Sequence, residues 1–238
     1  MARTATARPR ARRPRALPGA RERALIVVER LKKEYPIAAT ALEYRDPWQL
    51  LVATILSAQT TDERVNLTTP ELFRRWPTPH ALASAPLEEV EQVLRPTGFY
   101  HMKALAITAM SQDVVSKHGG EIPRAMEELV QLRGVGRKTA NVVLGVAFGV
   151  PGLPVDTHVA RLSRRLRLAR SSDPDVIEAE LCALVPPEEW RDLGLRLILH
   201  GRRICDARRP LCERCVLNDI CPSAYVAVRP PRRRRSAA

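Results

Sequence analysis

Two glycines two residues apart, Gly134 and Gly136, separate two segments with the apolar spacing of helices. Glycine lets the backbone turn tightly and brings bare N–H groups to the surface. The helix that follows adds its own unpaired N–H groups and its positive dipole end, so the turn can hold a phosphate. A plain turn between helices has the same glycine spacing, but the apolar anchor Val135 and the cations Arg137 and Lys138 favour a hairpin that binds DNA phosphates.

Lys138 falls in the first turn of the helix that follows this hairpin. A lysine nucleophile must be deprotonated, and both the helix dipole and the neighbouring Arg137 disfavour the ammonium form. A lysine after a hairpin is as often a phosphate contact, so both roles are open on the residues alone. Asp156 opens the next expected helix, where it can be an N-cap, a carboxylate that stabilises a cationic sugar, or both.

A second motif places four cysteines close together near the end of the chain, with six, two and five residues between successive members: Cys205, Cys212, Cys215 and Cys221. Four thiolates at such spacing can hold either zinc or a [4Fe–4S] cube, and the spacing alone does not decide between them. The fifth cysteine, Cys182, lies in an apolar helical segment and is interpreted as a core residue. An odd, clustered set indicates a metal in a reducing compartment rather than a disulfide framework.

The net charge of +13 is concentrated at the two ends of the 238-residue chain. Eight arginines lie in residues 1–23 and five in residues 229–235, which leaves the rest of the chain nearly neutral. Met1–Arg23 has no apolar core like that of a secretory signal, and its prolines interrupt the helix that a mitochondrial presequence needs. We therefore expect basic arms, disordered over 1–20 and 229–238, on a cytoplasmic protein whose partner is nucleic acid. No apolar run approaches the ~20 residues of a membrane helix, so no membrane partner is expected.

The elements that must position these residues all have helical periodicity, and no strand with period two is found. Capping residues followed by proline or by an apolar stripe predict where the helices begin. The expected helices are 21–34, 48–58, 62–76, two short ones after Pro79 and Pro86, 99–116, 126–132, 136–148, 156–168, 176–185 and 188–201. Residues 48–58 are apolar nearly all round and should be central. The Gly/Pro-rich stretch Gly149–Pro154 marks the domain boundary, and we expect the first helix to pack with the cysteine-rich end.

These motifs together resemble the helix–hairpin–helix DNA glycosylase superfamily, and within it the endonuclease III family. The resemblance rests on Leu132–Val143 followed by Val155–Val159, on Leu56–Asp62, Thr97–Tyr100 and Ile198–Arg202, and on the four cysteines; it runs from about Arg21 to Tyr225. It implies an all-α fold of two helical domains with a DNA-binding cleft between them. Residues 40–150 would form a six-helix barrel with the hairpin, and 21–39 with 151–228 the iron–sulfur domain.

The resemblance also implies an activity, a cofactor and roles for single residues. The family contains base excision repair enzymes that are both DNA glycosylase and abasic-site lyase. Lys138 would be the nucleophile that forms a Schiff base with the sugar, and Asp156 the catalytic carboxylate. The four cysteines would hold a structural [4Fe–4S] cluster. The protein would be a monomer associated with the nucleoid, and it would act on duplex DNA with oxidised pyrimidines or abasic sites.

Contacts with DNA are implied for the hairpin and for four further places in the chain. Gln59 and Phe99 would fill the gap left by the flipped nucleotide. The other expected DNA contacts are Gly134, Val135, Gly136, Arg137, His158, Arg208 and Arg209. Phe99 departs from the family's leucine, and a buried aromatic at the start of a helix is its alternative interpretation. Arg133 stands where the family often has proline, which should loosen the entry to the hairpin slightly and add a charge near phosphate.

Other functions are compatible with parts of this pattern. A relative with another base specificity is the nearest, acting on adenine opposite damaged guanine or on a pyrimidine dimer. Lys138 argues against the adenine glycosylases, because that branch lacks the hairpin lysine. A zinc-bound DNA-binding module without catalysis is an alternative of a different class, which metal analysis would separate by zinc in place of iron. A structural hairpin protein would have no use for Asp156.

Overall fold

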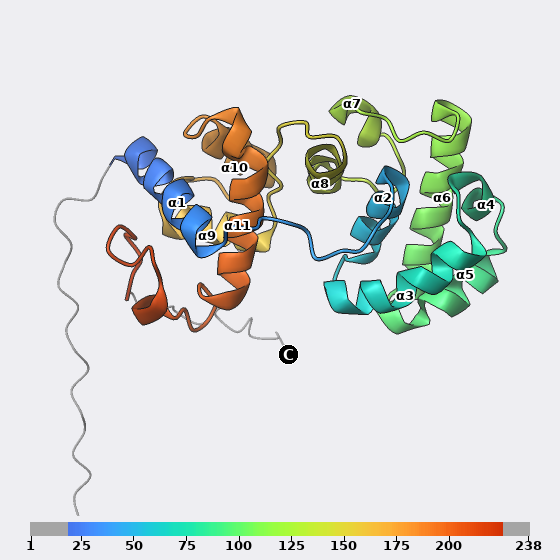
Figure 1. Cartoon of the computed structure of the whole chain (residues 1–238), viewed down its shortest axis with the longest axis horizontal. Coiled ribbons are helices and arrows are strands. Elements are labelled where there is room, and N and C mark those ends of the chain that lie inside the picture. Colours follow the sequence, from blue (N-terminus) through green and yellow to red (C-terminus); the bar gives the residue numbers. More distant parts are fainter. Residues whose placement is uncertain (1–18, 226–238) are drawn as a thin grey trace, which may run out of the picture.

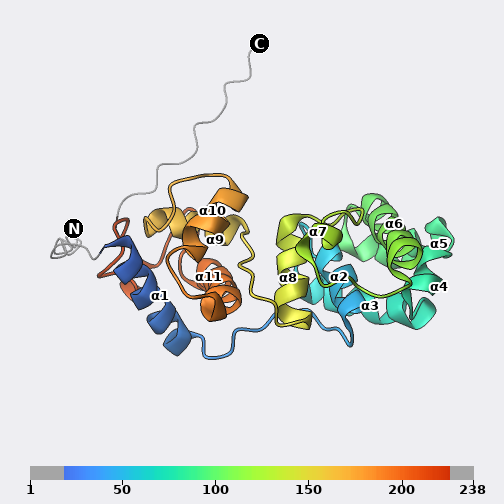
Figure 2. The ribbon, with the colours of Figure 1, turned by 90° about the horizontal axis from the view of Figure 1, so that it is seen from above.

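The computed structural model describes residues 19–225, and within them the chain is helical, without strands. Two lobes lie side by side (Figures 1 and 2). The expected arms fall outside the described residues except at their inner edge. There the expected boundary was wrong by one residue, because Ala20 is already the first residue of α1.

Eleven α-helices form the two lobes of the described part. Their bounds are α1 Ala20–Glu34, α2 Pro47–Leu56, α3 Asp62–Arg75, α4 Pro79–Ala83, α5 Leu87–Leu94, α6 Tyr100–His118, α7 Met126–Leu129, α8 Arg137–Ala147, α9 Thr157–Arg165, α10 Pro174–Cys182 and α11 Trp190–Arg203. Short 3₁₀ turns occur at Arg95–Thr97, Pro187–Glu189 and Cys212–Arg214. None of the described helices is long and apolar enough to cross a membrane.

Polar caps set the start of several helices, as the sequence predicts. The Asp46 carboxylate accepts the N–H of Gln49 at 2.8 Å, and Pro47 follows it as the first helical residue. Thr61 and Thr78 cap α3 and α4 with their hydroxyls, and Asp173 caps α10 with its carboxylate. Each cap satisfies an N–H group that has no partner inside the helix.

Helices α2–α8 pack around one hydrophobic core and form the first lobe. This is the lobe in which the resemblance places the six-helix barrel. Helix α2 is its centre: every residue from Trp48 to Leu56 is buried, and α2 contacts α3, α6 and α8. Helix α8, which follows the hairpin, contributes Ala140, Val143 and Leu144 to this core. The hairpin is therefore anchored in the first lobe by the helix that leaves it.

The second core joins the two ends of the described chain. Val27 and Leu31 of α1 pack with α9–α11 and with Leu217 and Ile220 of the cysteine-rich segment. Arg30 donates to the carbonyl of Val216 at 2.8 Å. The expected packing of the first helix against the cysteine-rich end is confirmed. The first core ends at Phe148, and from Leu153, within the stretch Gly149–Pro154, the chain belongs to the second core. This change of core supports the proposed domain division.

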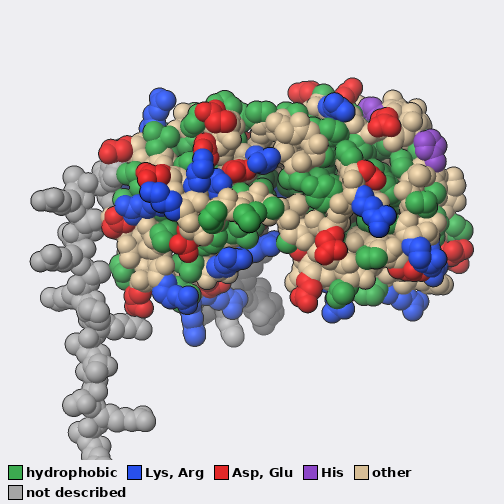
Figure 3. Space-filling model, viewed as in Figure 1, with side chains coloured by type: hydrophobic (Ala, Val, Ile, Leu, Met, Phe, Trp, Pro, Cys, Tyr) green, Lys and Arg blue, Asp and Glu red, His purple; other side chains and the backbone are tan. Residues whose placement is uncertain are grey.

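Side-chain bridges join the lobes, whose space-filling surface is hollowed between them along the lower edge in Figure 3. Arg202 of α11 pairs with Asp62 at the start of α3, Nη1 to Oδ2 2.9 Å. Arg137 at the start of α8 pairs with Glu178 of α10. These pairs fix the first turns of α3 and α8 against the second lobe.

Candidate active site

Lys138 lies in the first turn of α8, directly after the hairpin. Gly136 is the N-cap residue, with extended backbone, so the helix begins at Arg137. The Lys138 side chain is exposed and forms no hydrogen bond or ion pair with any residue from 19 to 225. An amine without a partner at the positive end of a helix is available to attack an electrophile.

The hairpin itself has the geometry that the two glycines predict. Gly134 has φ +78°, the left-handed region that favours glycine, and a Cβ there would lie 3.2 Å from the Cβ of Ala106. Val135 is buried and donates its N–H to the carbonyl of Leu132 at 3.1 Å. Val135 thus anchors the hairpin in the core, while the backbone of the turn is free to face a phosphate.

Arg133 fixes the hairpin instead of loosening it, so the expectation for this departure from proline was wrong. Its backbone N–H and its Nε both donate to Oδ2 of Asp113, at 3.1 and 3.0 Å. Its Nη2 donates to the carbonyl of Ala109 at 3.0 Å. Arg133 therefore ties the entry of the hairpin to α6 by an ion pair and two backbone contacts, and it shares the Asp113 carboxylate with Lys117.

Asp156 is the N-cap of α9 and is partly buried. Its Oδ1 accepts the N–H groups of His158 and Val159 at 2.8 and 2.9 Å. Its Oδ2 accepts no hydrogen bond from the residues that the structure describes. One oxygen thus holds the carboxylate in place while the other is available to a substrate, so the capping and catalytic roles are compatible.

The helix that carries Lys138 is tied to the loop that leads to Asp156. Asn141, one turn after Lys138, is buried and donates to the carbonyl of Leu153 at 3.5 Å. A Cβ at Gly152 would lie 2.5 Å from Oδ1 of Asn141. Only glycine allows this approach of the loop to α8, which links the positions of the two candidate groups.

His158 lies in the first turn of α9, half-buried beside Arg161. Nη2 of Arg161 donates to Nδ1 of His158 at 3.0 Å. Because a guanidinium can only donate, Nδ1 is the acceptor and Nε2 carries the ring proton. Burial lowers the pKa of His158, which favours this neutral form. The ring can then offer an N–H to a phosphate oxygen, as the sequence predicts.

Arg137 has a protein partner that the sequence did not reveal. Its Nε and Nη2 donate to the two carboxylate oxygens of Glu178 at 2.8 and 3.2 Å. The paired carboxylate neutralises the cation beside Lys138. Contact of Arg137 with DNA therefore stays a prediction, and the observed role of this guanidinium is to join α8 to α10.

Gln59 and Phe99 lie on two turns and both project into solvent. Both are in the left-handed region, with φ +54° and +47°. Phe99 is 67% exposed, so the alternative interpretation as a buried aromatic was wrong. Backbone strain of this kind is concentrated at functional sites. Two exposed side chains on strained backbone therefore fit residues that insert into a duplex.

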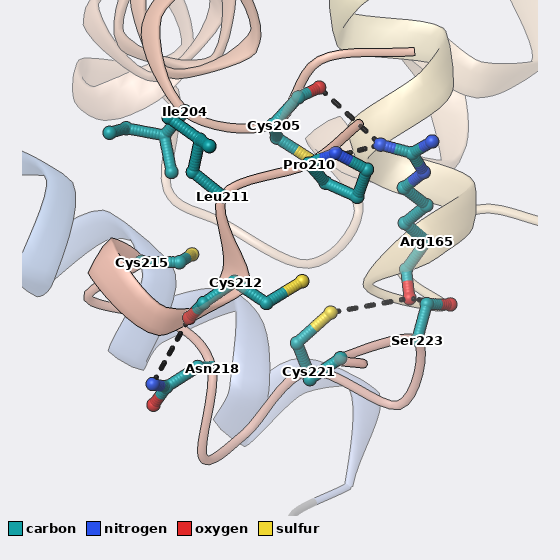
Figure 4. Close-up of a pocket in the computed structure, with 11 residues that line it drawn as sticks. Arg165, Ile204, Cys205, Pro210, Leu211, Cys212, Cys215, Asn218, Cys221 and Ser223 are labelled. Carbon is teal, nitrogen blue, oxygen red and sulfur yellow. Dashed lines mark hydrogen bonds between the residues drawn. The ribbon is translucent and has the colours of Figure 1, made fainter. Parts of the chain in front are cut away.

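The four cysteines of the second motif line one cavity of the second lobe (Figure 4). Among the described residues, no three His, Cys, Asp or Glu side chains lie close enough to hold a single metal ion. The thiols thus surround a space rather than meet at a point. A cube of four irons fits this arrangement, because each thiolate binds a different iron. Burial raises the pKa of the Cys215 thiol to about 12, so a thiolate there needs the positive charge of bound iron.

Neighbouring side chains hold the cysteines in this arrangement. Arg165 of α9 donates to Sγ of Cys205 at 3.2 Å (Figure 4). It also donates to the carbonyls of Asp206 and Ala207 at 2.7 and 2.8 Å. His200 of α11 lies with Nε2 3.2 Å from Sγ of Cys215. Such contacts orient ligands and tune a metal centre. The residues present fit an iron–sulfur cluster.

The loop between Cys205 and Cys212 presents two exposed cations. Oδ1 of Asp206 accepts the backbone N–H groups of Arg208 and Arg209, each at 2.8 Å. Neither guanidinium is engaged by another described residue. The turn therefore holds both arginines at the surface, where they can meet phosphates.

The sequence matches two family profiles. Residues 52–187 match the HhH-GPD superfamily base excision DNA repair protein, and residues 205–221 match the iron-sulfur binding domain of endonuclease III. An endonuclease III of Synechocystis sp. is 49% identical over 214 residues, 90% of this chain and 98% of that protein. The chain belongs to the endonuclease III family. It is thus a base excision repair glycosylase and abasic-site lyase with a [4Fe–4S] cluster.

Other relatives of the endonuclease III family agree with this assignment. The Escherichia coli K12 endonuclease III is 40% identical over 197 residues, which cover 83% of this chain and 93% of that protein. A solved structure of a trapped endonuclease III–DNA covalent intermediate, an estranged-adenine complex, has a TM-score of 0.82 at 42% identity and covers 86% of this chain and 96% of its own. A thermostable thymine-DNA glycosylase, 23% identical with a TM-score of 0.77, shares the fold.

Proposed function

We propose that this endonuclease III-family enzyme removes oxidised pyrimidines from duplex DNA, with Lys138 as the nucleophile and Asp156 as the catalytic carboxylate. The observation that supports this most directly is that both groups are available for chemistry. Lys138 is exposed and without a partner, and Oδ2 of Asp156 accepts no hydrogen bond within the described residues. The contact of Asn141 with Leu153 ties the helix of Lys138 to the loop that leads to Asp156.

The reaction divides between these two groups. The Lys138 amine forms a bond to C1′ of the damaged nucleotide, and the glycosidic bond breaks with its electron pair leaving on the base. The sugar is cationic in the transition state, and the Asp156 carboxylate stabilises it and accepts the proton that Lys138 loses. The C1′–O4′ bond then breaks with a proton going to O4′, which opens the sugar and leaves a Schiff base. The Schiff base acidifies the C2′ hydrogen, and loss of this proton to a base lets β-elimination expel the 3′ phosphate and cut the strand.

The remaining site residues would bind the duplex around this centre. The backbone of Gly134–Gly136, the N–H of His158 and the cations Arg208 and Arg209 face phosphates. Gln59 and Phe99 fill the gap after the nucleotide flips out. We infer that one copy of the chain binds one site, and that the enzyme works on nucleoid DNA in the cytoplasm.

A panel of duplexes tests the substrate. The full chain with its cluster is incubated with duplexes that contain thymine glycol, dihydrouracil, uracil, adenine opposite 8-oxoguanine or an abasic site. We expect base release from the first two, and strand cleavage 3′ to the abasic site with the β-elimination end. Faster release of uracil or adenine than of thymine glycol would contradict the proposed specificity.

A further inference from the structure

Lys103 is a buried cation in the first turn of α6, and it is 6% exposed. The positive end of the helix dipole disfavours a cation at this place. Burial lowers the pKa of Lys103, and no described carboxylate pairs with it. Its ammonium donates instead to Oγ1 of Thr60 and, at 3.0 Å, to the carbonyl of Thr97. An apolar side chain would cost less here, so the cation needs another explanation.

The partners of Lys103 belong to the two turns that carry Gln59 and Phe99. Thr60 follows Gln59, and its hydroxyl, which accepts from Lys103, donates to the carbonyl of Thr97 at 2.7 Å. Thr97 comes two residues before Phe99 and is itself buried. One ammonium and one hydroxyl thus join two turns that are about forty residues apart in the chain.

These contacts supply what the strained backbone lacks. A non-glycine residue in the left-handed region costs on the order of 1–3 kcal/mol and persists only where its surroundings fix it. Gln59 and Phe99 are both exposed, so their own side chains do not pay this cost by packing. The Lys103–Thr60–Thr97 contacts hold the residue that follows Gln59 and the residue two positions before Phe99.

We propose that Lys103 is a positioning residue, which locks Gln59 and Phe99 at a fixed separation, ready to enter the duplex together. This inference rests on the proposed function, in which these two side chains replace the flipped nucleotide. Lys103 touches neither the base nor the sugar. It acts by holding the two turns as one rigid element, so that insertion costs little ordering of the loops.

Substitution of Thr60 tests the proposal with little risk to the fold. Thr60→Val keeps the shape but removes the hydroxyl that links Lys103 to Thr97, and Thr60→Ser restores it. Thr68→Val is the matched control, because Thr68 is a buried threonine whose hydroxyl bonds only within α3, to the carbonyl of Arg64. Lys103→Met removes the ammonium itself.

The readouts are affinity for duplexes with and without a tetrahydrofuran abasic analogue, and fluorescence of a 2-aminopurine opposite the analogue. We expect Thr60→Val and Lys103→Met to weaken binding to the analogue duplex about tenfold, within the range of one lost stacking contact. Binding to undamaged duplex should not change, and the fluorescence rise should fall. Thr60→Ser and Thr68→Val should behave as wild type.

Combination with Phe99→Ala separates this proposal from the proposed function. If Lys103 acts through Phe99, adding Thr60→Val to Phe99→Ala should cost little more. Normal analogue binding and fluorescence by Thr60→Val, while Phe99→Ala is defective, would overturn the positioning role alone. Equal losses on both duplexes, or no rescue by Thr60→Ser, would also overturn it. No effect of Phe99→Ala would refute the insertion role, and with it this inference.

Discussion

At the scale of the residue, Lys138 and Asp156 both lie at the start of a helix, where backbone N–H groups are unpaired and the dipole end is positive. Two of these N–H groups bind Oδ1 of Asp156 and leave Oδ2 without a described donor. Lys138 has no partner among the described residues. Both groups are therefore open to a substrate, and no ion pair with a described residue occupies either one.

Asp156→Asn removes the carboxylate but keeps a residue that caps helices well. We expect the single-turnover rate of base release to fall by about 10²-fold or more, the range of a lost acid–base group. Cleavage of preformed abasic duplex should fall far less, since it needs no glycosidic bond cleavage. Asp173→Asn, which alters the cap of α10, is the control. Equal losses in both assays would mean that Asp156 mainly supports the fold.

Phe99→Ala tests the exposed aromatic as an inserting side chain. Because a base can stack on the ring, binding to duplex with an abasic analogue should weaken by ~1–3 kcal/mol in a titration. The affinity of Phe99→Ala for undamaged duplex should be that of the wild type. The control is Leu67→Ala, which removes another exposed apolar side chain, from α3, and should bind both duplexes like the wild type. A comparable loss on both duplexes by Phe99→Ala would contradict insertion.

At the scale of the element, the hairpin depends on contacts that lie outside its own motif. Asp113 of α6 is 6% exposed and receives Arg133 and Lys117. Burial raises the pKa of Asp113, but the hydrogen bonds from Arg133 and Lys117 outweigh this and hold it at about 2. The ion pair replaces, by a contact with α6, the local stiffness that a proline would give to the entry of the hairpin.

Asp113→Asn should lower the free energy of unfolding by ~1–3 kcal/mol, the range for a buried hydrogen-bonded group that loses its charge. A carboxyl group whose pKa is lower in the folded state stabilises the folded protein at pH values above its pKa in the unfolded state. This stabilisation is lost as the pH falls toward the pKa of the folded state. The deficit should therefore be full at pH 7 and shrink between about pH 4 and pH 2, as urea unfolding at each pH will show. Glu71→Gln, in an exposed ion pair, should change little. A deficit independent of pH would contradict the account.

Helix starts were predictable from the sequence, and helix ends were less so. Asp46, Thr61 and Asp173 act as the caps that their positions predict. The helices expected to reach Ala58 and Leu168 end at Leu56 and Arg165 instead. A start has a local cause in one polar side chain, whereas an end depends on packing. Arg167, for example, takes φ +51° within the turn that follows α9.

The candidate site follows the same division. The hairpin, the cysteine spacing and the exposed Arg208 and Arg209 are local patterns, and the sequence predicted where they lie. The partners of Arg133 and Arg137, and the Thr60 partner of Lys103, are 20 or more residues away, and no periodicity indicates them. The one local signal for Lys103 was a lysine in the first turn of a helix.

At the scale of the whole molecule, the proposed chemistry needs two lobes in register. Lys138 belongs to the helix of one lobe, whereas Asp156 opens a helix of the other. Arg137–Glu178 bridges the lobes one residue from the proposed nucleophile. A shift of about 1 Å in a reacting group can cost 10²-fold in rate, so this bridge should matter for catalysis.

Glu178→Gln and Arg137→Gln should each slow single-turnover base release about tenfold, because either one breaks the bridge. Arg137→Gln should not change the slope of log K against log salt for binding to undamaged duplex, since in the wild type the guanidinium is occupied by Glu178. If Arg137 binds phosphate instead, Arg137→Gln alone should reduce that slope by ~0.9. A wild-type rate of base release by Glu178→Gln would refute the role of the Arg137–Glu178 bridge in catalysis.

We propose that Lys138 forms the covalent bond to the sugar. Borohydride reduces a Schiff base to a stable amine, so wild-type enzyme incubated with an abasic duplex and borohydride should give a covalent complex. Mass spectrometry of the digested complex should find the sugar on the peptide that contains Lys138. Lys138→Gln should bind the duplex and give no trapped complex. Trapping by this variant at the wild-type level, or attachment of the sugar to another residue, would contradict the account.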